Sequence, residues 1–166
     1  PRCTTMLLCN PHNPVGCVWT AGELRRIATL CRTYGVLLLI DEIHADFSWP
    51  EHPVTMMGEL GDDIARQCIE FTAPTKTFNL AGLLCSNTII RDPELKTRFD
   101  VAAENIGGMT VSHFGLVACI AAYNEAEGWF DELLDVVAAN LAAVRAFATA
   151  HNGIALVEPE GTYLAW

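Results

Sequence analysis

Short apolar runs alternate with amphipathic segments along the first half of the chain. Four runs, at residues 4–9, 36–40, 68–71 and 86–90, predict β-strands because each is short and bounded by polar or turn-forming residues. Their apolar character is continuous rather than alternating, as in a parallel sheet that is covered on both faces. The pattern therefore predicts an α/β fold in which a partly parallel sheet is flanked by helices.

A capping pattern marks the start of the first helix. Thr20-Ala-Gly-Glu23 matches Thr-x-x-Glu, in which two side chains satisfy each other's backbone N–H groups. Apolar residues then recur at helical spacing and form one face: Leu24, Ile27, Ala28 and Cys31. A helix of about four turns is expected between the first two strands.

The second half of the chain predicts mainly helices. We expect helices over residues 93–103 and 111–124, with a break at Asn105-Ile-Gly-Gly108. A longer apolar stripe follows, and such a stripe is typical of a helix packed in a core. It consists of Trp129, Phe130, Leu133, Leu134, Val137, Leu141, Val144 and Phe147. Two more strands are expected, at residues 154–157 and 162–166.

Composition and charge narrow the class of protein. A chain of 166 residues that is 51% hydrophobic can bury a core and suits one domain, or one domain plus a piece. A net charge of -10 does not favour binding to nucleic acid or to an anionic membrane surface, both of which attract clustered Lys and Arg. The longest aliphatic run, residues 36–40, is far shorter than the roughly 20 residues of a membrane helix. We therefore expect a soluble, cytoplasmic protein with neither partner.

The cysteines and the two ends add further expectations. Seven cysteines without a Cys-x-x-Cys pair argue against both a disulfide framework and a thiolate zinc site. The chain lacks an initiating Met, and it stops inside the predicted strand at 162–166. We therefore expect a fragment of a longer protein.

Polar segments follow three of the predicted strands. They are residues 10–13, 41–44 and 72–76, and the carboxyl ends of parallel strands lie along one edge, where open α/β sheets bind ligands. The segments bring a lysine, a carboxylate and an asparagine together without a glycine-rich dinucleotide loop. This combination suits pyridoxal phosphate, because a lysine forms a Schiff base with its aldehyde and a carboxylate keeps its ring nitrogen protonated. An amide can donate to the ring phenolate.

Each of these residues also has a purely structural interpretation. Lys76 alone would most often be a solvated loop residue, and Asp41 with Glu42 could cap the following segment. Asn10 and Asn13 could make Asx-turns. His44 could be a packed histidine. It could also join Asp41, Asp46 and His52 in a metal site, but we predict no metal.

Three motifs carry a resemblance to a known family. They are Cys9-Asn-Pro-His-Asn-Pro-Val-Gly16, Asp41-Glu-Ile-His-Ala-Asp46 and Ala73-Pro-Thr-Lys-Thr-Phe-Asn-Leu-Ala-Gly82. In this order the chain resembles the fold-type I pyridoxal-phosphate enzymes, in particular the cystathionine β-lyase branch (the MalY/PatB type) of the class I/II aminotransferases. The resemblance extends to the last residues, 158–166. It implies the central part of the large domain of that fold, in residues 1–127, followed by a bridging helix and the start of the small C-terminal domain, in residues 128–166.

The resemblance also implies roles for individual residues. Lys76 matches the Schiff-base lysine, Asp41 the partner of the pyridinium nitrogen, and Asn13 the donor to the phenolate oxygen. His44 stands where many aminotransferases have a tyrosine that contacts the same oxygen. Thr75 completes the cofactor-binding set expected from the resemblance, because its hydroxyl could substitute for that of a serine found nearby in many aminotransferases.

Two positions depart from the usual aminotransferase pattern. Ala73 replaces a serine three residues before the lysine, and Leu84 replaces an arginine for the cofactor phosphate eight residues after it. The lyase branch resembles this chain in lacking that arginine.

The resemblance implies a carbon–sulfur β-lyase that releases pyruvate, ammonia and a thiol from a sulfur amino acid. A class I/II aminotransferase is the alternative, and a truncated non-catalytic fragment is a second one. A homodimer is expected for the complete parent. The 166 residues alone are expected to bind the cofactor weakly and to show no turnover.

Overall fold

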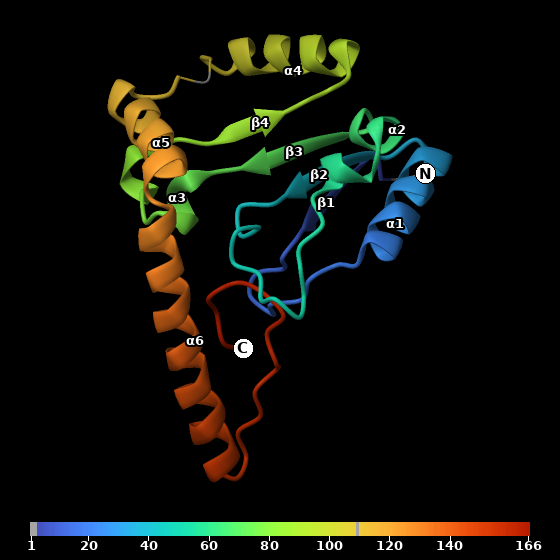
Figure 1. Ribbon diagram of the computed structural model, residues 1–166. Helices are drawn as coiled ribbons and strands as arrows, with labels where there is room; N and C mark the ends of the chain where they lie inside the picture. The colour runs from blue at the N-terminus through green and yellow to red at the C-terminus, as the bar shows by residue number, and fades with distance from the viewer. Residues whose placement is uncertain (1–2, 109) are drawn as a thin grey trace.

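A four-stranded mixed sheet forms the centre of the computed structural model, which describes residues 3–108 and 110–166 (Figure 1). The strands are β1 (Thr5–Cys9), β2 (Leu37–Asp41), β3 (Cys68–Thr72) and β4 (Asn87–Ile89), in that spatial order. The first three run parallel and β4 runs antiparallel to β3. The predicted partly parallel sheet is confirmed. β4 is reversed because only short helical turns, and no crossover helix, connect it to β3.

Helix α1 (Ala21–Tyr34) packs on the sheet where the sequence predicts it. The capping box is formed, with Thr20 Oγ1 accepting from the Glu23 N–H at 3.3 Å and Glu23 Oε2 accepting from the Thr20 N–H at 2.9 Å. The helix ends at Gly35, whose φ of 63° suits glycine. Its buried face carries three of the four predicted residues, Leu24, Ala28 and Cys31, and Ile27 is partly buried.

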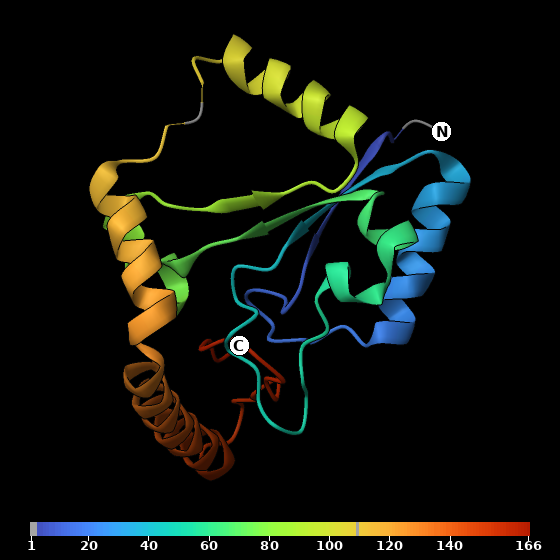
Figure 2. The same ribbon diagram turned by 45° about the horizontal axis from the view of Figure 1, so that its top comes forward.

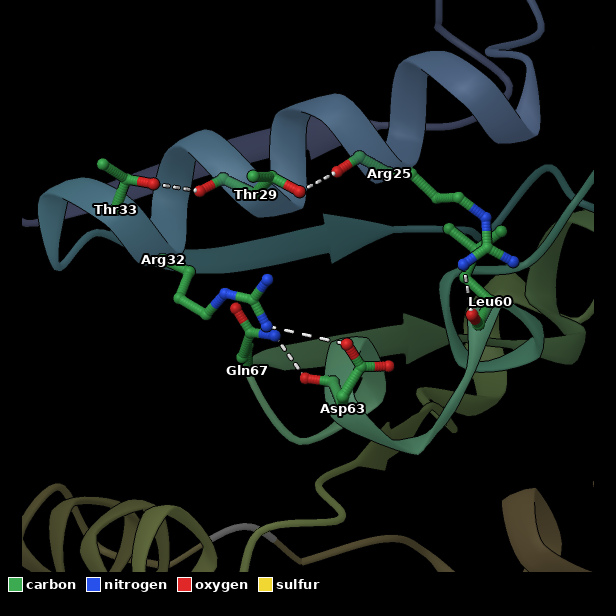
Figure 3. Close-up of polar contacts among 7 residues, drawn as sticks. All are labelled: Arg25, Thr29, Arg32, Thr33, Leu60, Asp63 and Gln67. Atoms are coloured by element: carbon green, nitrogen blue, oxygen red, sulfur yellow. Dashed lines mark hydrogen bonds and ion pairs between the residues drawn. The ribbon is translucent and has the colours of Figure 1, made fainter.

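Two arginines tie α1 to the segment before β3, which contains η1 (Met57–Leu60) and α2 (Asp62–Ala65). Figure 3 shows Arg25 Nη1 donating to the Leu60 carbonyl, at 2.7 Å, and Arg32 facing Asp63 at 3.6 Å. The contacts lie beside a core in which α1, the sheet and η1 interdigitate. Its fully buried members include Leu24, Leu38, Ile40 and Met57.

Three longer helices follow β4, namely α4 (Pro93–Asn105), α5 (His113–Glu125) and α6 (Glu127–Ala150). Their positions confirm the predicted helices. In Figures 1 and 2, α6 extends away from the sheet, and the C-terminal coil returns beside it toward the loops at the end of the strands.

The apolar stripe of α6 is not a core stripe in this structure, so that prediction is wrong. Leu141 is the one buried residue of the helix, whereas Trp129 and Phe147 are 47% and 55% exposed. Periodicity predicted the helix correctly, but burial needs an opposing layer. At the start of α6, Phe130 packs against Phe47, with ring centroids 5.2 Å apart, whereas farther along the helix the described residues supply mainly the C-terminal coil. Among the described residues, α6 is also the one helix that is long and apolar enough to cross a membrane, by length and composition alone. Its apolar residues are interrupted by charged ones, so it contains no long aliphatic run.

The predicted strands at 154–157 and 162–166 are absent. Both segments are coil, joined by a hydrogen bond from the Val157 N–H to the Trp166 carbonyl at 2.8 Å. A strand needs a ladder of such bonds, and an isolated two-stranded pair is marginal. The coil instead forms a single bridge with the chain near the sheet, between Gly161 and Ser48.

Candidate cofactor site

The three polar loops meet at one edge of the sheet. Cys9 at the end of β1 pairs with Asp41 at the end of β2, which in turn pairs with Phe71 of β3. The residues that follow these positions therefore emerge side by side, as expected for the carboxyl ends of parallel strands. Each loop contributes at least one residue of the expected cofactor site.

The loop after β1 is held by Asn10, which is fully buried. Its Oδ1 accepts from the Trp19 N–H and its Nδ2 donates to the Thr55 carbonyl, both at 3.1 Å. Asn10 therefore has a structural role, but it joins distant segments instead of making the Asx-turn that the sequence suggested. Asn13, three residues further, is exposed, and its Nδ2 lies 3.5 Å from Nε2 of His44.

Asp41 is the last residue of β2 and is partly buried. Its Oδ1 accepts from the Ile43 N–H at 3.1 Å, which tightens the turn that leads to His44. The carboxylate thus caps the local turn, as the structural interpretation suggests, while it stays at the ligand edge of the sheet.

Glu42 points into the protein interior and has a structural role. It is 1% exposed, and its Oε1 accepts from the Met57 N–H at 2.8 Å. Burial raises its pKa to about 8, against the lowering effect of that hydrogen bond, and the charges of Glu70 and Glu59 add to the rise. Asp41 and Glu42 are neighbours in sequence with different environments.

His44 is buried between the Asn13 loop and an aromatic cluster. It is 2% exposed, and its ring makes edge contacts with Tyr163, at 5.3 Å between centroids. Burial lowers the pKa of His44, the charge of Asp41 opposes this, and the charge of Lys76 adds to it. A neutral imidazole can accept a hydrogen bond at Nε2, the atom that faces Asn13.

Lys76 lies on α3 (Pro74–Thr77), a single helical turn directly after β3. Pro74 begins the turn, and the following Thr77 is anchored through Oγ1, which donates to Asp46 Oδ2 at 2.6 Å. Lys76 and Thr75 are partly buried and line a cavity of about 430 Å³. Part of the cavity wall is aromatic, with Phe47, Trp129 and Tyr163.

The structure also places Ala73 and Leu84, the two positions that depart from the usual aminotransferase pattern. Ala73 is the N-cap residue of α3 and makes no side-chain hydrogen bond. Because alanine has no hydroxyl, this position offers none to a cofactor. Leu84 is 81% exposed and has a φ of 52°. Within residues 3–108 and 110–166, no three His, Cys, Asp or Glu side chains gather as metal ligands, and His52 lies by Glu160 instead, at 3.9 Å.

Sequence reasoning missed the residues that reach the site from the far end of the chain. Tyr163 and Trp129 line the Lys76 cavity, and Glu160 contacts the Asn13 loop through the Val18 N–H. No local sequence pattern indicates such contacts, because they join positions more than 50 residues apart. The Asp46–Thr77 bond could have been suspected, since both residues lie in motifs of converging loops.

The fold is that of solved pyridoxal-phosphate enzymes. The family model described as "Aminotransferase class I and II" matches residues 1–166, and the chain belongs to that family.

Its relatives include "Cystathionine beta-lyase PatB" of Bacillus subtilis (strain 168), 35% identical over 167 residues, covering 100% of this chain and 43% of PatB. "Protein MalY" of Escherichia coli (strain K12) is 34% identical over 169 residues, and the match covers 100% of this chain and 42% of MalY. The crystal structure of cystalysin from Treponema denticola, which contains pyridoxal 5'-phosphate, superimposes with a TM-score of 0.93 at 36% identity, covering 98% of this chain and 42% of cystalysin. The chain thus spans less than half the length of these relatives.

Proposed function

We propose that the complete protein is a pyridoxal-phosphate-dependent carbon–sulfur β-lyase that releases pyruvate, ammonia and a thiol from a sulfur amino acid. The observation that carries the proposal is the convergence of three loops at one sheet edge. Asn13 lies beside His44, and the charges of Asp41 and Lys76 both act on that histidine.

The donor set fits this cofactor. Lys76 offers an amine for the aldehyde, Asp41 a carboxylate for the ring nitrogen, and Asn13 an N–H donor for the phenolate oxygen. We propose His44 as the support of Asn13, since its buried ring faces the amide at 3.5 Å, and Thr75 as a further polar contact on the Lys76 cavity. When bound, pyridoxal phosphate supplies an aldehyde that condenses with amines and a ring that withdraws electrons from Cα.

The chain's own residues would move and hold the protons of the reaction. The Lys76 amine is the base that removes the proton at Cα of the amino acid. The Asp41 carboxylate, by its charge, holds a proton at the ring nitrogen. The aromatic wall of Phe47, Trp129 and Tyr163 would shield the reacting side chain from water.

Lyase chemistry is favoured over transamination by two observations. PatB carries the name of a cystathionine β-lyase, and this chain has Leu84 where many aminotransferases have a phosphate-binding arginine. We further propose a homodimer, a domain boundary near Gly128 and a cytoplasmic location. The acidic residues Asp131, Glu132 and Asp135 on α6 argue against its insertion in a bilayer.

Incubation of the complete protein with cystathionine tests the proposal. With pyridoxal phosphate present and no added keto acid, pyruvate and free thiol should appear in equal amounts, measured by coupled lactate dehydrogenase and by thiol titration. S-methyl glutathione, which lacks a free cysteine α-amine, serves as the unreactive control. A strict requirement for a keto acid with no thiol released would make the protein an aminotransferase.

A further inference from the structure

The segment of residues 159–163, here called the clamp segment, is bonded to the loop that carries Asn13. The Gly16 carbonyl accepts from the N–H groups of both Glu160 and Gly161, each at 2.9 Å. The side chain of Glu160 adds a third hydrogen bond, in which its Oε2 accepts from the Val18 N–H at 2.9 Å. Three hydrogen bonds thus join segments that lie more than 140 residues apart.

The same segment also holds the turn that carries His44. The Thr162 N–H donates to the Phe47 carbonyl at 2.8 Å, and Gly161 forms a β-bridge with Ser48. Next to it, the Tyr163 ring meets both His44 and Phe47 edge-on, with centroids at 5.3 and 4.8 Å. The clamp segment therefore bonds to both loops that present the Asn13–His44 pair.

Little room is left between the clamp segment and the loops. A Cβ atom on Gly161 would lie 2.9 Å from the Phe47 carbonyl oxygen and 3.1 Å from Cβ of Pro11. On the other side, a Cβ atom on Gly16 would lie 2.7 Å from Cβ of Pro159, and its φ of 80° itself suits glycine. Two glycines allow this approach, so the separation of the loops is set by direct contact.

We infer that Glu160 is a positioning residue, which fixes the Asn13 loop against the His44 turn so that the amide of Asn13 is aimed at the cofactor. Asn13 is exposed and outside the sheet, so the sheet alone does not set its direction. A hydrogen bond to a carboxylate is among the stronger ones in a protein, and here it restrains the chain five residues beyond Asn13. The inference rests on the proposed role of Asn13 in cofactor binding.

The test uses the complete protein with substitutions at two glutamates. Glu160→Ala removes the acceptor, Glu160→Asp withdraws it, and Glu160→Gln keeps an acceptor oxygen. The matched control is Glu158→Gln in the same coil, because Glu158 pairs with exposed Arg145 and not with the Asn13 loop. Hydrogen exchange of the cofactor-free protein follows the Val18 N–H, and fluorescence titration with pyridoxal phosphate gives the dissociation constant.

In Glu160→Ala, the Val18 N–H should exchange about tenfold faster or more, and the dissociation constant should rise about tenfold. In Glu160→Asp, and in Glu160→Gln, which keeps an acceptor but loses the charge, the exchange rate and the dissociation constant should lie between those of the wild type and Glu160→Ala. Glu158→Gln should resemble the wild type. Faster exchange with unchanged affinity would make Glu160 merely structural and overturn the inference, as would equal losses in Glu158→Gln. If Glu160→Ala does not fold, Glu160→Asp decides the same question. A wild-type protein that fails to bind pyridoxal phosphate would instead refute the proposed function.

Discussion

The sheet region, residues 5–89, and the helical arm, formed by α4 to α6, differ in how far their helices are buried. In the sheet region, α1 buries Leu24, Ala28 and Cys31 against the strands. In the arm, α4 has no buried residue and α6 has Leu141 alone. An apolar face therefore predicts a helix, whereas a second layer of structure decides whether that face becomes part of a core.

The largest expected difference between the regions concerns the two lysines of the sequence, Lys76 in the sheet region and Lys96 in the arm. Lys76→Ala should lower turnover of the complete protein by about a thousandfold, because it removes the proposed base and cofactor anchor. Lys96 is ion-paired with Asp100 on α4, so Lys96→Ala should leave turnover unchanged.

Borohydride reduction followed by peptide mapping checks the same assignment without an activity assay. The pyridoxyl label should appear on Lys76. A label on Lys96, or normal turnover in Lys76→Ala, would move the active site out of the sheet edge.

The next largest difference between the two regions should be in the effect of core substitutions on the free energy of unfolding. Leu24→Ala should lower the free energy of unfolding by about 2–5 kcal/mol, since Leu24 is fully buried and leaves a cavity. Val136→Ala on α6, where the side chain is 56% exposed, should change it by about 0.5 kcal/mol or less. Urea unfolding of both variants measures the effects. A cost above about 1 kcal/mol for Val136→Ala would show that another part of the complete protein covers this face of α6.

A smaller effect is expected from the buried carboxyl of Glu42. Its pKa is raised to about 8 in the folded protein, above the value near 4.5 of an exposed glutamate, so the folded state holds this proton more tightly. The free energy of unfolding should therefore fall as pH rises between these values, by at most about 1.4 kcal/mol per pH unit from this group.

Glu42→Gln should flatten this slope, because glutamine does not ionise and keeps an acceptor for the Met57 N–H. Glu132→Gln, an exposed position of the arm, is the control and should leave the slope unchanged. Urea unfolding at pH 5.5, 6.5 and 7.5 measures the slopes. Equal slopes in the wild type and Glu42→Gln would mean that Glu42 is ionised at neutral pH in the folded protein.

Local chemistry made several features predictable from the sequence. The capping box of Thr20 and Glu23 sets the start of α1 because both partners lie within one helical turn. The strands were recognisable because continuous apolar runs of this length suit a buried sheet. Lys76, Asp41 and Asn13 could be proposed together because each follows such a strand, and parallel strands end at one edge.

Other features depend on contacts that no local pattern contains. The reversal of β4, the coil at residues 154–157 and the exposure of α6 depend on which segments pair or pack across the chain. The same holds for the full burial of Glu42 beside partly buried neighbours and for the clamp segment at Glu160. The sequence by itself determined the helices, the central strands and the residue types of the candidate site, because these follow from local propensity and period. The tertiary structure alone decided burial, strand direction and the support of Asn13, because each results from the meeting of residues distant along the chain.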